Sequence, residues 1–188
     1  MITPEQFERI MHSDSNEEKI KILESTCKCK DPAILDTIIL ALDDSDIQVR
    51  GEAFSALVLN ENDITDILIQ KLNSQSKNVR GYSLLILANR NERKAIPKII
   101  ELTSDESAMV RSCAAGALGH LKVAEAILVI QKCMDDPNPE VRKSAIKAAI
   151  DIGDQTVFAK IDEISREDPE IRNLFDYAKS KLDGPGGI

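Results

Sequence analysis

The sequence predicts an all-α fold, an α-solenoid in which antiparallel helix pairs stack in a row. A dipeptide of valine or isoleucine followed by arginine recurs at near-constant spacing. Its arginines are Arg50, Arg80, Arg111, Arg142 and Arg172. The segments between the copies have apolar residues at helical spacing, whereas no segment alternates as a half-buried strand does. Because one pair of helices cannot bury its own apolar face, neighbouring pairs must stack.

Each dipeptide is predicted to lie in the first turn of a helix. Four residues before each arginine stands a residue whose side chain can accept a hydrogen bond from that turn, as helix N-caps do. These residues are Asp46, Ser76, Ser107, Asn138 and Asp168. In the last two copies the next residue is proline, which is tolerated at the first helical position. Small side chains, which let another helix approach closely, stand three residues after the first four arginines: Ala53, Ser83, Ala114 and Ala145.

The repeat spacing divides the chain into three parts. Residues 1–30 are expected to form N-terminal capping helices, because Thr3–Gln6 and Ser15–Glu18 have the pattern of a capping box but the small-residue column is missing. Residues 31–182 are expected to form the repeat array, and residues 183–188 are expected to form a flexible tail. The repeat units are expected near 31–60, 61–90, 91–121, 122–152 and 153–182.

The composition argues against several functional classes. The 188 residues carry a formal net charge of −8 and only 3% are aromatic, which disfavours a nucleic-acid surface of clustered basic residues and stacking rings. No apolar run approaches the roughly 20 residues of a membrane span, and the N-terminus lacks the apolar segment of a secretory signal. We therefore expect a cytoplasmic protein with neither a membrane nor a nucleic-acid partner.

Residues suited to catalysis or metal binding are few. Cys27 and Cys29 form a close pair, but no second pair of Cys or His at zinc spacing accompanies them. The sequence therefore predicts no metal site and leaves any redox role of this pair open. His12 and His120 are the two histidines, and the chain has no glycine-rich phosphate loop, serine nucleophile motif or HExxH motif. We expect no catalytic residue and no cofactor.

Two stretches, DDPNPEVRKSAIKAAIDIGD and SDESAMVRSCAAGALGHLKVAEAI, resemble HEAT repeats of the short type named after phycobilisome lyases. The resemblance covers about residues 31–182 and implies a right-handed superhelix of HEAT-like antiparallel helix pairs. It also implies a structural ladder, in which an aspartate six residues before each arginine pairs with that arginine or its neighbour. The ladder residues are Asp44, Arg50, Arg80, Asp105, Arg111, Asp136, Arg142 and Arg172. Ser74 and Arg166 depart from the pattern, so the ladder is expected to be incomplete there. An anion-binding row of arginines is the alternative interpretation.

The resemblance implies a non-enzymatic scaffold or adaptor that binds another protein, itself a monomer or weak homo-oligomer. In HEAT arrays the second helix of each pair commonly lines the concave face. Assigning that role to the helix before each N-cap gives a mixed charged and aliphatic surface, as a protein partner would suit. Its residues are Asp36, Leu40, Asp66, Gln70, Lys98, Glu101, Leu128 and Lys132.

Two alternative functions stay open at the level of sequence. The bilin lyases share this repeat type, so an enzyme subunit similar to them is one alternative, although fold analogy is its only support. A HEAT-like protein that binds or repairs DNA is the other. Such a protein needs a basic concave face and aromatic residues near the base, and both are scarce in this chain.

Overall fold

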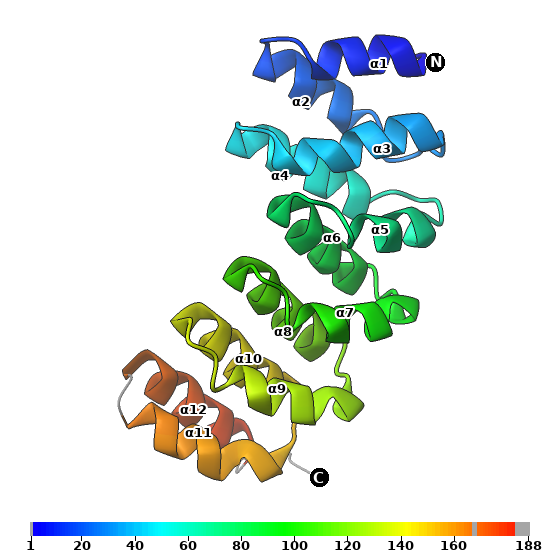
Figure 1. Cartoon of the computed structure of the whole chain (residues 1–188). Coiled ribbons are helices and arrows are strands. Elements are labelled where there is room, and N and C mark those ends of the chain that lie inside the picture. Colours follow the sequence, from blue (N-terminus) through cyan, green and yellow to red (C-terminus); the bar gives the residue numbers. More distant parts are fainter. Residues whose placement is uncertain (1, 167–168, 183–188) are drawn as a thin grey trace. The chain divides into compact units, whose positions relative to one another are not determined.

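The computed structural model describes residues 2–166 and 169–182, and every regular element within these ranges is a helix (Figure 1). The predicted all-α fold is confirmed. The chain divides into two compact units, Met1–Lys98 and Ile99–Ile188. The helix cap predicted at Asp168 and the tail predicted at 183–188 lie outside the described residues.

The first unit consists of successive helix pairs. Within it α2 packs against α4, α4 packs against α6, and α1 packs against α3. In chain order the elements are α1 (Pro4–Met11), α2 (Asn16–Glu24), α3 (Pro32–Leu40), η1 (Ala41–Asp43), α4 (Ile47–Val58), α5 (Thr65–Lys71), α6 (Lys77–Asn89) and η2 (Arg93–Ala95). Helix α7 (Ile96–Leu102) spans the residues at which the two units meet in sequence.

The second unit continues the same alternation. Helix α10 contacts α8, α9 and α12, and α11 packs against α12. The elements are α8 (Ala108–His120), η3 (Ala124–Ala126), α9 (Ile127–Cys133), α10 (Pro139–Ile152), η4 (Gln155–Val157), α11 (Phe158–Ser165) and α12 (Pro169–Leu182). Pro139 is the first residue of α10, where the sequence predicts it.

The side chains at the helix N-termini explain why α4, α6 and α10 begin where they do. Asp46 accepts hydrogen bonds from two first-turn amides, while Ser76 and Asn138 each accept one. Ser107 is the N-cap residue of α8 but its side chain makes no capping hydrogen bond. Its own amide donates to the carboxylate of Asp105 at 2.8 Å, as the amides of Asp46 and Asn138 do to the aspartates two residues before them. The prediction is right about the position of this cap and wrong about its chemistry.

The column of small residues lies at the centre of the helix packing. Ala53, Ser83, Ala114 and Ala145 are fully buried. Helices α8 and α10 approach each other closely at Gly119, since a Cβ placed there would lie 2.5 Å from the Cα of Ala148. Helices α8 and α10 can therefore pack this closely only because Gly119 has no side chain.

A buried polar network joins the loops of the first unit. Arg90 donates to four main-chain carbonyl oxygens at the end of α4 and in the segment after it, those of Leu57, Val58, Asn60 and Asn62, at 2.6–3.3 Å. The buried side chain of Asn60 donates in turn to the carbonyl oxygen of Cys29 at 2.9 Å. Because these carbonyls have no helical partner, the arginine supplies the hydrogen bonds that a helix or water would otherwise provide.

Candidate functional site

The repeated arginines make the same main-chain contacts in successive repeats. The Nη1 of Arg50 donates to the carbonyl oxygens of Asp44 and Ser45, at 2.7 and 3.0 Å. Arg80, Arg111 and Arg142 bond to the residues six and five positions before them in the same way. Each of these arginines thus uses Nη1 to close the loop that precedes its own helix. Its Nε and Nη2 take no part in these loop bonds.

The residue six positions before each arginine also has a local task. Asp44, Asp105 and Asp136 each accept a hydrogen bond from the amide two residues later, at 2.8 Å. At the equivalent position the hydroxyl of Ser74 accepts this bond at 3.2 Å. Ser74 therefore preserves the turn but brings no negative charge to it.

Ion pairs connect this loop to the preceding repeat. Arg111 Nε and Nη2 donate to the two carboxylate oxygens of Asp136, at 2.7 and 2.9 Å. The side chains of this pair are mostly buried, with Arg111 17% and Asp136 9% exposed. The hydrogen bond from Arg111 lowers the pKa of Asp136. Two parallel bonds between a guanidinium and a carboxylate give the pair a defined geometry.

The first unit contains an equivalent pair that uses lysine. Lys19 Nζ lies 3.0 Å from Asp44 Oδ2. Burial acts to raise the pKa of Asp44, but hydrogen bonds from the Asp46 amide and Lys19 outweigh it, so this pKa lies below its usual value. Lys19 precedes Arg50 by 31 positions and follows the N-cap Ser15 by four. This spacing identifies Lys19 from the sequence once lysine is accepted in place of arginine, but the repeated dipeptide is defined by arginine and does not include it.

Two positions of the row have no carboxylate opposite them. Among the described residues, main-chain carbonyls are the hydrogen-bond partners of Arg50 and Arg142. By register the position facing Arg50 is Ser74, and the position facing Arg142 is Arg166, whose side chain bonds to Asp162 at 3.0 Å. Arg172 contacts the carboxylates of Asp162 and Asp176 at 3.4 and 3.3 Å.

The residues expected to contact a partner lie on α3, α5, α7 and α9. Leu40 and Leu128 are 53% and 68% exposed, respectively. Asp36 pairs with Lys71, and Asp66 pairs with Lys94 at 2.5 Å. The other expected residues are Gln70, Glu101 and Lys132, which are exposed, and Lys98, which is half-buried. These helices thus carry both solvent-exposed leucines and charged side chains.

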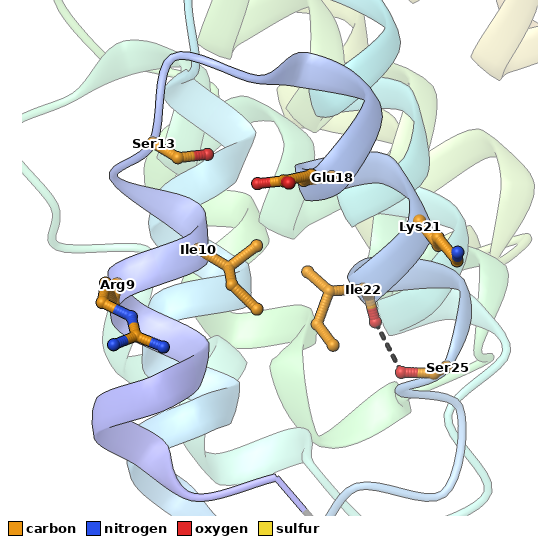
Figure 2. Close-up of a pocket in the computed structure, with 7 residues that line it drawn as sticks. All are labelled: Arg9, Ile10, Ser13, Glu18, Lys21, Ile22 and Ser25. Carbon is orange, nitrogen blue, oxygen red and sulfur yellow. Dashed lines mark hydrogen bonds between the residues drawn. The ribbon is translucent and has the colours of Figure 1, made fainter.

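Two grooves are described in the first unit. The larger lies between α1 and α2 and has a volume of about 620 Å³ (Figure 2). Ile10 and Ile22 face each other across it. Arg9, Glu18 and Lys21 stand at its edges, and the hydroxyl of Ser25 donates to the carbonyl oxygen of Ile22 at 2.7 Å. The groove combines an apolar floor with charges of both signs, so its electrostatics favour no particular ligand.

The smaller groove, of about 270 Å³, lies between α4 and α6, and Arg50 is one of its lining residues. Its other lining residues are Ile47, Gly51, Phe54, Tyr82 and Leu85. The rings of Phe54 and Tyr82 meet edge to face, with centroids 6.3 Å apart. This groove therefore has Arg50 next to aromatic and aliphatic side chains in its lining.

Two of the four cysteines have thiols shielded from water, and both histidines lie at helix ends. Burial raises the pKa of Cys113 to about 11 and also raises that of Cys133, which disfavours the reactive thiolate. His12 and His120 are exposed at the ends of α1 and α8. In residues 2–166 and 169–182 no three His, Cys, Asp or Glu side chains cluster as metal ligands, and no helix there could cross a membrane.

Helix pairs that recur with the same loop-closing arginine define a helical-repeat protein. The family model of HEAT repeats matches residues 65–127 and 114–174, which together span more than half of the chain. The chain belongs to the HEAT repeat family. A model of a HEAT repeat associated with sister chromatid cohesion matches residues 30–51. Among curated proteins, none matches this chain.

Solved structures with the same architecture include both natural and designed repeat proteins. The complex of CpcE and CpcF of phycocyanin lyase from Nostoc sp. PCC7120 matches with a TM-score of 0.70 at 20% identity, covering 79% of this chain and 99% of that chain. A designed armadillo repeat protein in complex with the peptide (KR)4 matches with a TM-score of 0.57 at 18% identity, over 96% and 99% of the two chains. At these identities the likeness describes the fold alone. The predicted α-solenoid and the resemblance to the phycobilisome-lyase type of HEAT repeat are confirmed.

Proposed function

We propose that this chain is a non-enzymatic scaffold that binds another protein on the exposed faces of α3, α5, α7 and α9. The observation that carries the proposal is the exposure of Leu40 and Leu128 among charged side chains. Covering such side chains on binding is favourable by roughly 25 cal/mol for each Å² of apolar surface. Charged neighbours keep the free surface in solution and select the partner through complementary charge.

The acidic residues of these helices can exchange partners at little cost. Asp66 and Lys94 are both largely exposed, and exposed ion pairs contribute little to stability because water and salt screen them. A basic residue of the partner can therefore replace Lys94 beside Asp66. Asp36 is 45% exposed, but its partner Lys71 from the next helix pair is only 22% exposed, so this pair is screened less than that of Asp66.

The reactive groups of the chain favour binding over catalysis. Both described grooves are open to solvent, and an open groove cannot exclude water as an enclosed active site does. The thiols of Cys113 and Cys133 have raised pKa values, so they are poor nucleophiles at neutral pH. The likeness to a lyase complex concerns the fold and assigns no reacting residue to this chain.

Capture of the partner from the source organism tests this proposal. The chain is immobilised, the retained protein is identified by mass spectrometry and purified, and its affinity is measured by calorimetry. The variant Asp36→Lys, Asp66→Lys, Glu101→Lys reverses charge on the proposed surface. We expect it to fold as the parent does and to bind the purified partner at least about tenfold more weakly, with a slower association rate.

A second triple variant with the same change of net charge is the matched control. Glu8→Lys, Glu17→Lys and Asp151→Lys alter exposed acids on α1, α2 and α10. Affinity should stay within about twofold of the parent in this variant. Equal weakening by both triple variants would mean that net charge, and not these faces, determines binding. An affinity that neither variant changes would place the partner on another surface.

A further inference from the structure

We propose that the groove between α4 and α6 binds a partner segment in which an acidic side chain stands next to an aromatic or large aliphatic one, with Arg50 holding the carboxylate. The inference rests on the proposed protein-binding function and names the chemistry that one surface recognises. Four kinds of observation carry it: an internal template, an open position in the arginine row, an apolar wall and the local charge.

The template is the pair formed by Arg111 and Asp136. Arg111 holds its own loop through Nη1 and uses Nε and Nη2 to grip the carboxylate, at 2.7 and 2.9 Å. The molecule thus shows what an arginine at this point of a repeat binds when a carboxylate is present. Planar, two-point recognition of this kind suits carboxylates well.

Arg50 is held in the same way but has no such partner. Its Nη1 bonds to the loop at 2.7 and 3.0 Å, close to the 2.9 and 3.2 Å of Arg111. In the register of the repeats, Ser74 occupies the place of Asp136, and the hydroxyl of Ser74 is engaged by the amide of Ser76. The half-buried guanidinium is therefore fixed by its loop, while its second edge lacks an acid among the described residues.

Apolar side chains of α4 and α6 form the wall beside this cation. Ile47, Gly51 and Phe54 share one face of α4 with Arg50, because they follow the helical spacing of three and four residues. Ile47 is 72% exposed. Gly51 leaves open space, since a Cβ there would meet nothing within 4 Å. A side chain adjacent to the bound acid can lie in this space against Phe54.

The local charge argues for a single carboxylate and against a polyanion. The chain carries a net charge of −8, so a nucleic-acid backbone would be repelled by the rest of the surface. The nearby acid Asp43 accepts a hydrogen bond from Asn78 at 2.8 Å. Arg142, which also has only main-chain partners among the described residues, faces the position of the basic Arg166. Arg50 is thus the arginine of the row that combines an open edge with an apolar groove.

Peptide titrations monitored by NMR test the inference. The probe is a peptide with blocked termini and a central phenylalanine–glutamate pair in a glycine–serine frame, and its control has glutamine in place of glutamate. We expect the acidic peptide to shift the Arg50 Nε–H signal and the ring signals of Phe54 and Tyr82. It should bind at least about tenfold more tightly than the glutamine peptide, since hydrogen bonds between charged groups are stronger than those to a neutral amide.

Variants of the groove separate this account from nonspecific attraction. Ser74→Asp supplies a carboxylate to Arg50 from within the chain, so it should lower the affinity for the acidic peptide at least about tenfold. Ser74→Asn keeps the turn without the charge and should leave this affinity within about twofold of the parent. Gly51→Leu fills the open space of the groove and should also abolish binding. Folding of each variant is checked by circular dichroism.

Three results would overturn the inference. They are equal affinity for the two peptides, undiminished binding by the Ser74→Asp variant, and shifts centred on Arg142 in place of Arg50. None of these results touches partner capture through α3, α5, α7 and α9. Conversely, a peptide that binds at Arg50 while both triple charge variants capture the partner equally would uphold the groove and refute the proposed surface.

Discussion

The close contact between α8 and α10 gives the sharpest quantitative test of the packing. A Cβ added at Gly119 would lie 2.5 Å from the Cα and 2.7 Å from the Cβ of Ala148, whereas carbon atoms normally pack about 3.5–4.0 Å apart. The helices must therefore separate by roughly 1 Å, and overpacking of this kind costs about 1–3 kcal/mol. Gly116 lies in the same helix, and a Cβ there would meet nothing within 4 Å.

The two glycines allow the clash to be separated from helix propensity. Alanine is favoured over glycine in a helix by about 0.5–1 kcal/mol, and this gain applies equally to Gly116→Ala and Gly119→Ala. Gly116→Ala should raise the urea midpoint monitored by circular dichroism. Gly119→Ala should unfold more easily than Gly116→Ala by about 1–3 kcal/mol. Equal midpoints in the two variants would refute the close approach of α8 and α10.

Other expected outcomes concern the arginines and their partners. Arg90→Met should destabilise the chain to urea by about 2–4 kcal/mol, because it leaves several loop carbonyls without a charged donor; a loss below about 0.5 kcal/mol would contradict the network. Ser74→Asp should stabilise the chain by up to about 1 kcal/mol through a pair with Arg50, while Ser74→Asn should not. The pKa of Asp136 is lowered by Arg111 from the usual 3.8, so its contribution is present above that pH and is lost as the pH falls through the lower folded value. The melting-temperature difference between the parent and Asp136→Asn should accordingly be constant above about pH 5 and shrink toward pH 3; a difference that grows on acidification would reverse the assigned sign.

The repeat architecture could be predicted because it depends on local signals. The N-caps Asp46 and Ser76 act within one turn of the chain, and the small residues follow a helical period, so spacing alone exposes them. The cap at Ser107 shows the limit of that reasoning. Its position follows the spacing, but whether the Ser107 hydroxyl bonds to a first-turn amide depends on the orientation of that side chain, which the spacing does not determine.

Features that depend on contacts between repeats could not be predicted so well. Arg90 reaches carbonyls about 30 residues away, and no sequence pattern marks those atoms as unpaired. Lys19 escaped notice because a different residue type fills its place in the row. The groove at Arg50 combines an absent acid at Ser74 with the neighbouring rings of α4 and α6, and only the folded chain brings the rings together.

The central claim is that a partner protein covers the exposed leucines of the helix pairs. Hydroxyl-radical footprinting with mass spectrometry measures this directly, because the oxidation rate of a leucine follows its exposure to solvent. Leu40 and Leu128 are the reporters, and Leu59, which is 67% exposed at the end of α4, is the internal control. The account predicts that the captured partner slows oxidation of Leu40 and Leu128 at least about threefold and leaves that of Leu59 unchanged. Unchanged oxidation of both reporters in the saturated complex would contradict it.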